Sequence, residues 1–182
     1  MKERNFLKSE RIKQFESTPV ASYIPLESFN WLINESDFFT APASTKYHGN
    51  YEGGLFDHSF IVMNVLADLT KQNNLQWQRE ESPYIIGMLH DLCKVNQYKP
   101  SDGEYPYEYR TDTLLKGHGD KSVMVASTLL QLTEEEMLCI RYHMGAFTKK
   151  SEWEYYTRAV HKYPNVLWTH TADMIATHVV GT

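Results

Sequence analysis

A histidine and an aspartate, His90 and Asp91, stand side by side inside an apolar run over residues 84–92. The run is apolar on nearly every side, which is the pattern of a helix buried on most of its faces. A buried imidazole next to a buried carboxylate is unfavourable unless both groups are paired or bind a metal ion. The pair therefore limits the chain to folds that supply partners for it in the interior.

Four further His and Asp residues fall inside or at the end of other predicted helices, and one of them, Asp173, interrupts a second apolar helix. Two apolar helices are thus each interrupted by buried polar residues, and a common site for these residues explains both interruptions better than chance does. Mixed imidazole and carboxylate groups suit divalent transition metals, so these side chains are candidate ligands for two metal ions. The set consists of His58, His90, Asp91, His118, His143 and Asp173.

Helical geometry constrains how the central pair is used. Neighbours on a helix diverge by about 100°, so we expect that His90 and Asp91 do not ligate side by side. His90 would bind a single ion. The carboxylate of Asp91, which has two oxygens, would bridge to a second ion. The alternative is a metal-free protein in which His90 is a core histidine paired with Asp173.

The spacing of apolar residues predicts an all-α fold, because five or six principal helices follow one another with short connections. The chain is expected to form one domain over 1–182, with an N-terminal helical extension over 1–40 and a metal-binding core over 41–180. Alternating tyrosines near 105–109 predict a small β-hairpin insertion. The main helices are expected at 56–72, 82–97, 118–131, 133–144, 151–162 and 164–180.

Composition limits the possible partners and location. The formal net charge of -5 argues against a surface that coats nucleic acid generally, although two bound divalent ions would add positive charge at one place. Cys93 and Cys139 fall in helical patterns and are expected to be reduced and buried. No apolar stretch reaches the roughly 18 residues that span a bilayer, and 1–5 do not begin a signal peptide. We expect a cytoplasmic protein with no membrane partner.

Five short segments, taken in order, resemble the motifs of the HD-domain metal-dependent phosphohydrolases, and the resemblance covers roughly 41–180. The Gly-Gly-Leu-x-x-His opening is most similar to the HD domain of bacterial three-prime exoribonucleases. Residues 1–45 are too short and too helical to be the β-barrel that precedes that domain in those enzymes. Cys93 stands where the family often has glycine, which we interpret as a packing change. The segments are Tyr51–Ser59, Gly87–Lys94, Leu115–Gly119, Arg141–Gly145 and Leu167–Asp173.

This resemblance implies a helical-bundle HD fold with a dinuclear metal centre. His58, His90, Asp91 and Asp173 would hold one ion, and Asp91 would bridge to a second ion held by a further pair, His118 and His143. The ions would be two divalent transition metals drawn from Mn, Fe, Co, Ni or Zn. The implied activity is hydrolysis of nucleotide or short oligonucleotide phosphate esters by a hydroxide that bridges the two ions.

Several supporting roles are predicted around the centre. Asp91 and Lys94 are the candidate catalytic residues, and Lys94, one turn after Asp91, either contacts the substrate phosphate or is an ordinary solvated lysine. His48, in a glycine-rich loop, and His170, one turn before Asp173, are candidates for substrate binding, with a structural role equally open. The alternating tyrosines either stack on a base or, as we favour, pack on the body of the protein.

Two other classes of function remain open. The chain could be a catalytically silent HD-type nucleotide-binding regulatory module, although the complete set of six ligands argues against lost catalysis. It could also be an all-α interaction protein without metal, in which case a chelator would not change its stability. Basic residues at 146–163 suit either a groove for a nucleic-acid strand or a closed nucleotide pocket.

Overall fold

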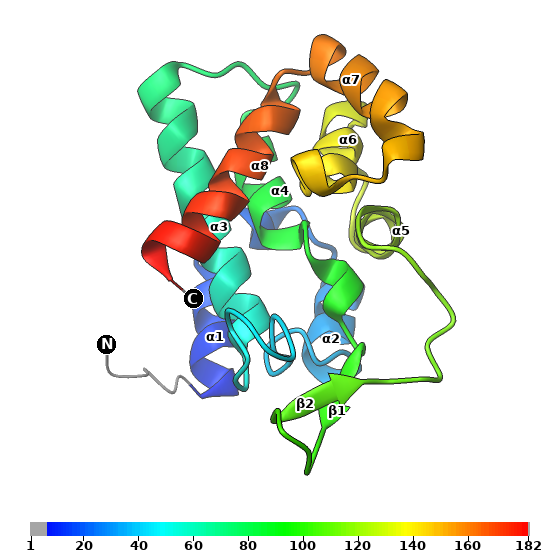
Figure 1. The fold of residues 1–182 in the computed structure, drawn as a ribbon. Coiled ribbons are helices and arrows are strands. Elements are labelled where there is room, and N and C mark those ends of the chain that lie inside the picture. The colour runs from blue at the N-terminus through cyan, green and yellow to red at the C-terminus, as the bar shows by residue number, and fades with distance from the viewer. Residues whose placement is uncertain (1–6, 182) are drawn as a thin grey trace.

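The structure is a computed structural model that describes residues 7–181, and these form a mostly helical bundle with one small hairpin (Figure 1). The predicted all-α class with a β-hairpin insertion is confirmed. The helices and strands are α1 (Lys8–Glu16), α2 (Leu26–Asn34), α3 (Gly54–Asn73), α4 (Ser82–Leu89), β1 (Tyr98–Pro100), β2 (Tyr107–Tyr109), α5 (Gly119–Leu129), α6 (Glu134–Tyr142), α7 (Trp153–Lys162) and α8 (Asn165–Ile175).

Helix α4 forms the centre of the bundle and packs against α3, α6 and α8. All of its residues are buried except Tyr84, which is half-buried, as the apolar run predicted. At Gly87 a Cβ atom would lie 2.3 Å from the Cα of Met63 in α3. The close approach of α3 and α4 therefore requires glycine at this position, and it brings the residues that follow α4 next to the start of α3.

The prediction of one continuous helix over 82–97 is wrong, because the α-helix ends at Leu89. Asp91 has φ -107° and ψ 19°, and a separate 3₁₀ turn, Leu92–Lys94, follows it. The apolar pattern continues through this turn because Leu92, Cys93 and Val95 are all buried. Burial alone does not distinguish an α-helix from a 3₁₀ turn, so the pattern concealed the break at the His-Asp pair.

The N-terminal segment packs closely on the rest of the fold. The Phe15 ring of α1 stacks on Phe29 of α2 with ring centroids 5.5 Å apart, and it meets the edges of Phe38 and Phe39. The rings of Phe38 and Phe39 in turn contact Phe56 of α3. This aromatic cluster (Phe15, Phe29, Phe38, Phe39 and Phe56) fixes the long loop before α3, which carries His48.

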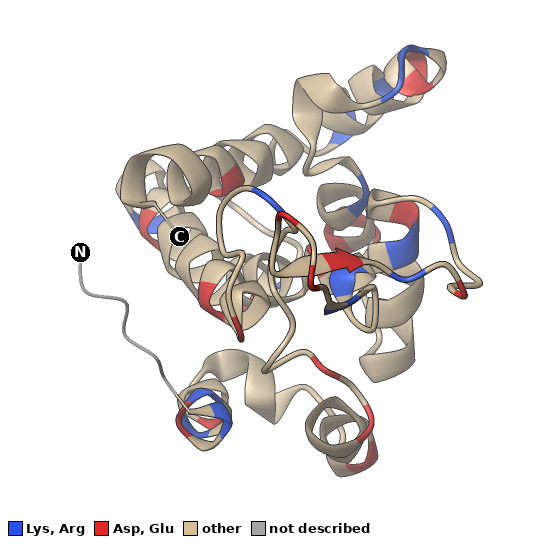
Figure 2. Ribbon diagram, turned by 60° about the horizontal axis from the view of Figure 1, so that its bottom comes forward, with Lys and Arg blue, Asp and Glu red and all other residues tan. Residues whose placement is uncertain are grey.

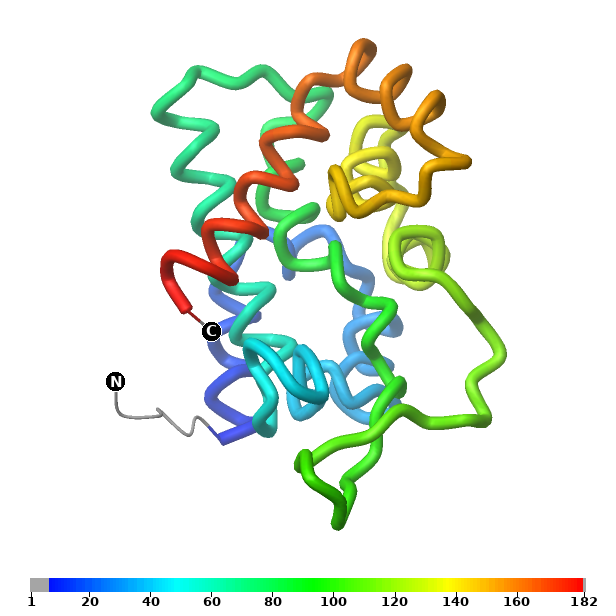
Figure 3. Tube along the Cα trace, in the orientation of Figure 1, coloured from blue at the N-terminus to red at the C-terminus, as the bar shows by residue number. Residues whose placement is uncertain are grey.

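The remaining elements follow the sequence signals closely. Pro25 precedes α2, and a capping box of Thr133 and Glu136 begins α6, close to the start expected at residue 133. Helix α8 continues into a π-helical turn, Ala176–Val180. Strands β1 and β2 pair antiparallel with Tyr98 opposite Tyr109. A long connection leads from the hairpin around the outside of the bundle to α5 (Figure 3).

Charged residues of both signs are mixed over the molecule. Figure 2 shows Lys and Arg beside Asp and Glu on the same elements, α1 among them. This mixture agrees with the absence of a generally basic surface expected from the net charge. None of the helices within residues 7–181 combines the length and apolar character needed to cross a membrane.

Candidate metal centre

The six predicted ligands converge on one place in the bundle, although they lie in, or directly beside, five different helices. His58 lies in the first turns of α3, His90 and Asp91 directly follow α4, and Asp173 lies near the end of α8. His118 immediately precedes α5, and His143 immediately follows α6. All six side chains except that of His118 are almost fully buried.

Asp91 divides the other five ligands into two groups. Its Oδ2 atom lies 3.7 Å from Nε2 of His58 and 3.5 Å from Nε2 of His90. Nε2 of His58 also lies 3.2 Å from Oδ1 of Asp173. We call His58, His90 and Asp173 the first group. Each of these contacts uses the atom with which the residue would ligate a metal.

The other carboxylate oxygen faces a separate pair of histidines. Oδ1 of Asp91 lies 3.1 Å from Nε2 of His118 and 3.5 Å from Nε2 of His143. The two Nε2 atoms are themselves 3.1 Å apart. We call His118 and His143 the second group. One carboxylate thus presents one oxygen to each group.

These separations fit metal coordination. Ligand bonds of about 2.0–2.2 Å place neighbouring ligands of a tetrahedral or octahedral ion roughly 3.0–3.6 Å apart, which is the spacing found within both groups. Oδ1 of Asp91 is buried and receives no well-aligned hydrogen bond from the described residues. A buried carboxylate oxygen without a hydrogen bond is costly in a metal-free protein, whereas a bound cation would satisfy it.

The imidazole rings are held with the correct nitrogen toward the centre. Nδ1 of His90 donates to the backbone carbonyl oxygen of Gly87 at 2.8 Å, and Nδ1 of His143 donates to that of Ile140 at 2.6 Å. In the neutral form of each ring the proton is therefore on Nδ1, and Nε2 presents a lone pair to the centre. Metal-binding histidines commonly have this arrangement.

Protonation also favours ligation. Burial lowers the pKa of His90 to about 3, so its ring is neutral at neutral pH. Burial by itself would raise the pKa of Asp91, but the Lys94 ammonium and the nearby imidazoles hold it well below the usual value. The pKa of Asp173 is lowered against the effect of burial by its contact with His58. Neutral imidazoles and ionised carboxylates are the forms that bind metal.

The metal-free protein is expected to lose stability as the pH falls from about 6.5 to about 4. Burial lowers the pKa of His48 to about 4 and that of His90 to about 3, so the unfolded chain binds more protons than the folded one in this range. The free energy of unfolding should therefore rise with pH, with a slope of about one proton per buried imidazole. Urea denaturation of chelator-treated protein at several pH values measures this slope. A free energy of unfolding independent of pH over this range would contradict the assignment of neutral rings.

A cleft of about 810 Å³ opens onto the centre. Five residues of the predicted site line it, namely His48, Asp91, Lys94, His118 and Asp173. Lys94 is not a solvated lysine, because its side chain is 12% exposed and its Nζ atom lies 2.6 Å from Oδ2 of Asp91. The other lining residues are Ala43, Ser44, Tyr47, Tyr98, Tyr109, Met144, Phe147, Met174, Thr177 and His178.

The two histidines proposed for substrate binding, His48 and His170, occupy different surroundings. The His48 ring lies against that of His58 with centroids 4.9 Å apart, so it borders both the centre and the cleft. His170 is not among the residues that line the cleft. Its Nδ1 atom instead lies 2.8 Å from the backbone carbonyl oxygen of His143, where it holds the segment that follows α6.

Several residues of the cleft wall were not identified from the sequence. His178 is exposed and lines the cleft. It lies in the π-helical turn that follows α8. Asp173 and His178 both line the cleft although they are five positions apart, so a search at the α-helical spacing of three or four residues misses this relation.

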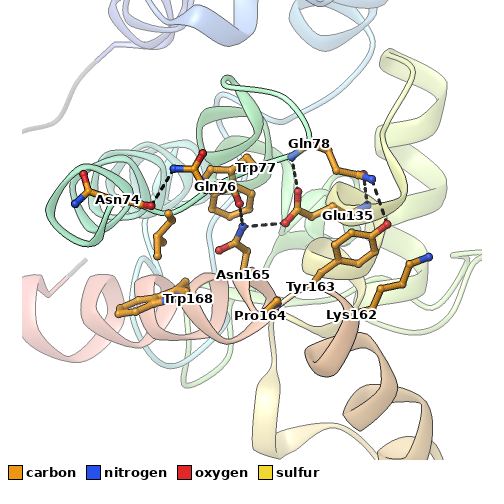
Figure 4. Close-up of a pocket in the computed structure, with 11 residues that line it drawn as sticks. Asn74, Gln76, Trp77, Gln78, Glu135, Lys162, Tyr163, Pro164, Asn165 and Trp168 are labelled. Atoms are coloured by element: carbon orange, nitrogen blue, oxygen red, sulfur yellow. Dashed lines mark hydrogen bonds between the residues drawn. The ribbon is translucent and has the colours of Figure 1, made fainter.

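Two of the other hollows on the described surface bear on the choice of site. One, of about 270 Å³, shares His118, Met144 and Phe147 with the cleft. The other, of about 550 Å³, lies at the opposite end of α8 (Figure 4). There Asn165 donates to Oε1 of Glu135 and to the carbonyl of Gln76. The polar groups of this remote hollow are thus largely bonded to one another, and it contains none of the predicted site residues.

Comparison with known proteins gives one relevant similarity. The chain is 30% identical over 128 residues to the 3'-5' exoribonuclease YhaM of Bacillus subtilis (strain 168), and the match covers 66% of this chain but 38% of YhaM. The chain thus spans about two-fifths of that relative's length. No family model matches the chain, and no solved structure matches it. The similarity agrees with the resemblance to three-prime exoribonucleases, and together with the buried His/Asp cluster it supports a metal-binding hydrolase.

Proposed function

We propose that this protein is a metal-dependent phosphohydrolase that cleaves phosphate ester bonds of oligonucleotides or nucleotides, with two divalent transition metals as cofactors. The observation that carries the proposal is the position of Asp91, which presents one oxygen to each of two ligand groups. When bound, two such ions lower the pKa of a shared water and polarise the phosphoryl group. Such a centre has no need of a serine or cysteine nucleophile.

The surrounding residues would bind and orient the substrate. The ammonium of Lys94 borders the cleft beside Asp91, where it can contact an oxygen of the phosphoryl group that is attacked. His48, with its pKa lowered to about 4 mainly by burial, carries no proton to give up as an imidazolium at neutral pH. We therefore assign His48 to hydrogen bonding with the substrate and not to protonation of the leaving group.

The shape of the site favours a strand over a single nucleotide. The cleft and the adjoining hollow of about 270 Å³ share His118, Met144 and Phe147, so a strand bound in the cleft could extend past His118 into the hollow. A closed nucleotide pocket would instead need several cationic groups around the phosphates. Arg141, which lines the adjoining hollow, is already paired with Asp120 and Glu152.

Exposed aromatic rings at the mouth of the cleft support a base-bearing substrate. Tyr109 and Phe147 are both exposed and line the cleft, and the Tyr109 ring leans on that of the buried Tyr98 with centroids 5.1 Å apart. Of the three alternating tyrosines, Tyr105 and Tyr107 are half-buried, as packing on the body requires, whereas Tyr109 is exposed. Flat exposed rings beside a phosphate site are suited to stacking on bases.

Replacing Tyr109 by alanine is expected to raise KM for a short oligonucleotide about 5- to 150-fold, since stacking contributes about 1–3 kcal/mol per base. The kcat value for a small phosphodiester without a base should stay unchanged. Tyr155→Ala is the matched control, because Tyr155 is also exposed but lies on α7, outside the lining of the cleft. Equal KM values for the Tyr109 and Tyr155 variants would contradict a stacking role.

The proposed function is tested with short single-stranded RNA and DNA labelled at the 5′ end, a panel of mononucleotides and a small phosphodiester, each with Mn²⁺ supplied. We expect metal-dependent shortening of the strands and slower hydrolysis of mononucleotides. Stoichiometric metal with nucleotide binding but no hydrolysis of any substrate would instead identify a silent regulatory module. Protein that binds no metal would overturn the proposal entirely.

A further inference from the structure

Cys93 contacts the second ligand group directly. Its Sγ atom lies 2.9 Å from Nδ1 of His118, and its own backbone N–H donates to Oγ of Ser122 in α5 at 3.1 Å. The side chain is 4% exposed and lies in the 3₁₀ turn between Asp91 and Lys94. The cysteine is thus held against the one ring nitrogen of His118 that points away from the centre.

The reason for this contact lies in where each histidine stands on its helix. His90 and His143 end α4 and α6, and each bonds the carbonyl oxygen three residues earlier in its own helix. His118 stands before the first turn of α5, so no preceding helical turn offers it a carbonyl. An acceptor for its Nδ1 proton must come from another segment, and Cys93 supplies the atom at that position.

We propose that Cys93 is a positioning residue for the second metal site, in which its sulfur accepts a hydrogen bond from Nδ1 of His118 and fixes the lone pair of Nε2 toward the centre. The inference rests on the metal centre of the proposed function. It replaces the interpretation of Cys93 as a mere packing change.

The environment of Asp91 supports this direction of the hydrogen bond. Nε2 of His118 lies 3.1 Å from Oδ1 of Asp91, yet this oxygen receives no well-aligned hydrogen bond from the described residues. A metal bound at the second group would take the lone pair of Nε2, and the ring proton of His118 would then be on Nδ1, 2.9 Å from the Cys93 sulfur. With 36% of its side chain exposed, His118 also has less packing to hold its ring than His90 or His143.

The experiment is a Co²⁺ titration of the metal-free chain, followed by visible absorption and by elemental analysis after dialysis. The wild type is expected to bind two ions per chain. In Cys93→Ala the affinity for one ion should fall about 10- to 100-fold, the usual effect of losing a partner behind a ligating histidine, while the other ion binds as before. Cys93→Ser, which keeps a hydrogen-bonding atom but a shorter one, should restore part of the loss.

Cys139→Ala is the matched control, because Cys139 is also a buried free thiol but lies within α6; it should bind both ions as the wild type does. Thermal unfolding identifies any variant that does not fold. If Cys93→Ala does not fold, the metal affinities of Cys93→Ser decide the test. Unchanged affinities in the folded Cys93 variants would overturn the inference while leaving the proposed function intact. An intense sulfur-to-cobalt charge-transfer band would also overturn it, since Cys93 would then be a ligand. A wild type that binds fewer than two ions would overturn the dinuclear centre and this inference together.

Discussion

Asp91→Ala is expected to abolish metal binding in both ligand groups and to lower the rate of phosphate ester hydrolysis roughly 10³-fold or more, which corresponds to a loss of about 4 kcal/mol or more of transition-state stabilisation. The physical reason is that one side chain serves both groups, with Oδ2 near His58 and His90 and Oδ1 near His118 and His143. Substitution of any single histidine would remove a ligand from one group only. The measurements are metal content by elemental analysis and the rate of strand shortening with Mn²⁺ supplied.

The same loss should follow the isosteric Asp91→Asn change, which preserves side-chain volume and removes the charge. This second variant separates the loss of a ligand from a packing defect. Asp68→Asn provides the control, because Asp68 lies exposed on α3 and its substitution changes the net charge by the same amount. Hydrolysis at the wild-type rate by either Asp91 variant, with a full complement of metal, would disprove the bridging role.

Arg11→Ala is expected to lower the free energy of unfolding by about 3–5 kcal/mol, the usual cost of removing one partner of a buried ion pair. The guanidinium group of Arg11 is 1% exposed and bonds both oxygens of Asp57, with Nε to Oδ1 at 2.8 Å and Nη2 to Oδ2 at 2.9 Å. It also lies across Gly53, where a Cβ atom would come within 2.0 Å of the Arg11 Cζ. Gly53 has φ 83°, so the glycine before α3 is required both by its backbone and by this guanidinium.

Urea denaturation followed by circular dichroism measures this loss. Arg11→Lys should recover only part of it, since an ammonium group cannot bond both carboxylate oxygens as a planar fork does. Lys13→Ala is the control on the same helix, because Lys13 is exposed and should change the free energy of unfolding by less than about 0.5 kcal/mol. A loss below about 1 kcal/mol for Arg11→Ala would show that the ion pair of Arg11 with Asp57 contributes little to stability.

The sequence predicted the helical class and the convergence of six side chains because the signals were local and strong. A polar residue such as Asp173 within an apolar helix is conspicuous, and the capping box at Thr133 and Glu136 marks a helix start without reference to distant contacts. The roles of these side chains stay predictions until a metal is measured. Their approach to within 3.1–3.7 Å of one another is what the structure adds.

The geometry of the central pair could not be predicted in the same way. Helical divergence suggested that His90 and Asp91 point apart, yet Nε2 of His90 lies 3.5 Å from Oδ2 of Asp91. The pair faces one centre because the α-helix ends before it, and the backbone of Asp91 leaves the helical region. This break depends on how the following 3₁₀ turn packs on α5, a contact between distant segments that leaves no periodic trace.

The cleft wall escaped prediction for a related reason. Tyr47, Phe147 and His178 come from separate loops or turns and share no spacing. Cys93 was noticed only as an unusual residue type, because its contact with His118 joins two segments that the sequence separates by 25 positions. Contacts of this kind follow from the assembled bundle and not from any one stretch of chain.

The aromatic cluster also bears on how the protein can be divided experimentally. Phe15 and Phe29 belong to the predicted N-terminal extension, and Phe56 belongs to the predicted core, yet their rings are joined through Phe38 and Phe39. Fragments that begin at residue 41 would leave Phe56 without these neighbours and uncover apolar surface at the base of α3. Truncation at that position would therefore produce an aggregation-prone polypeptide, and shortened versions for crystallisation should retain α1 and α2.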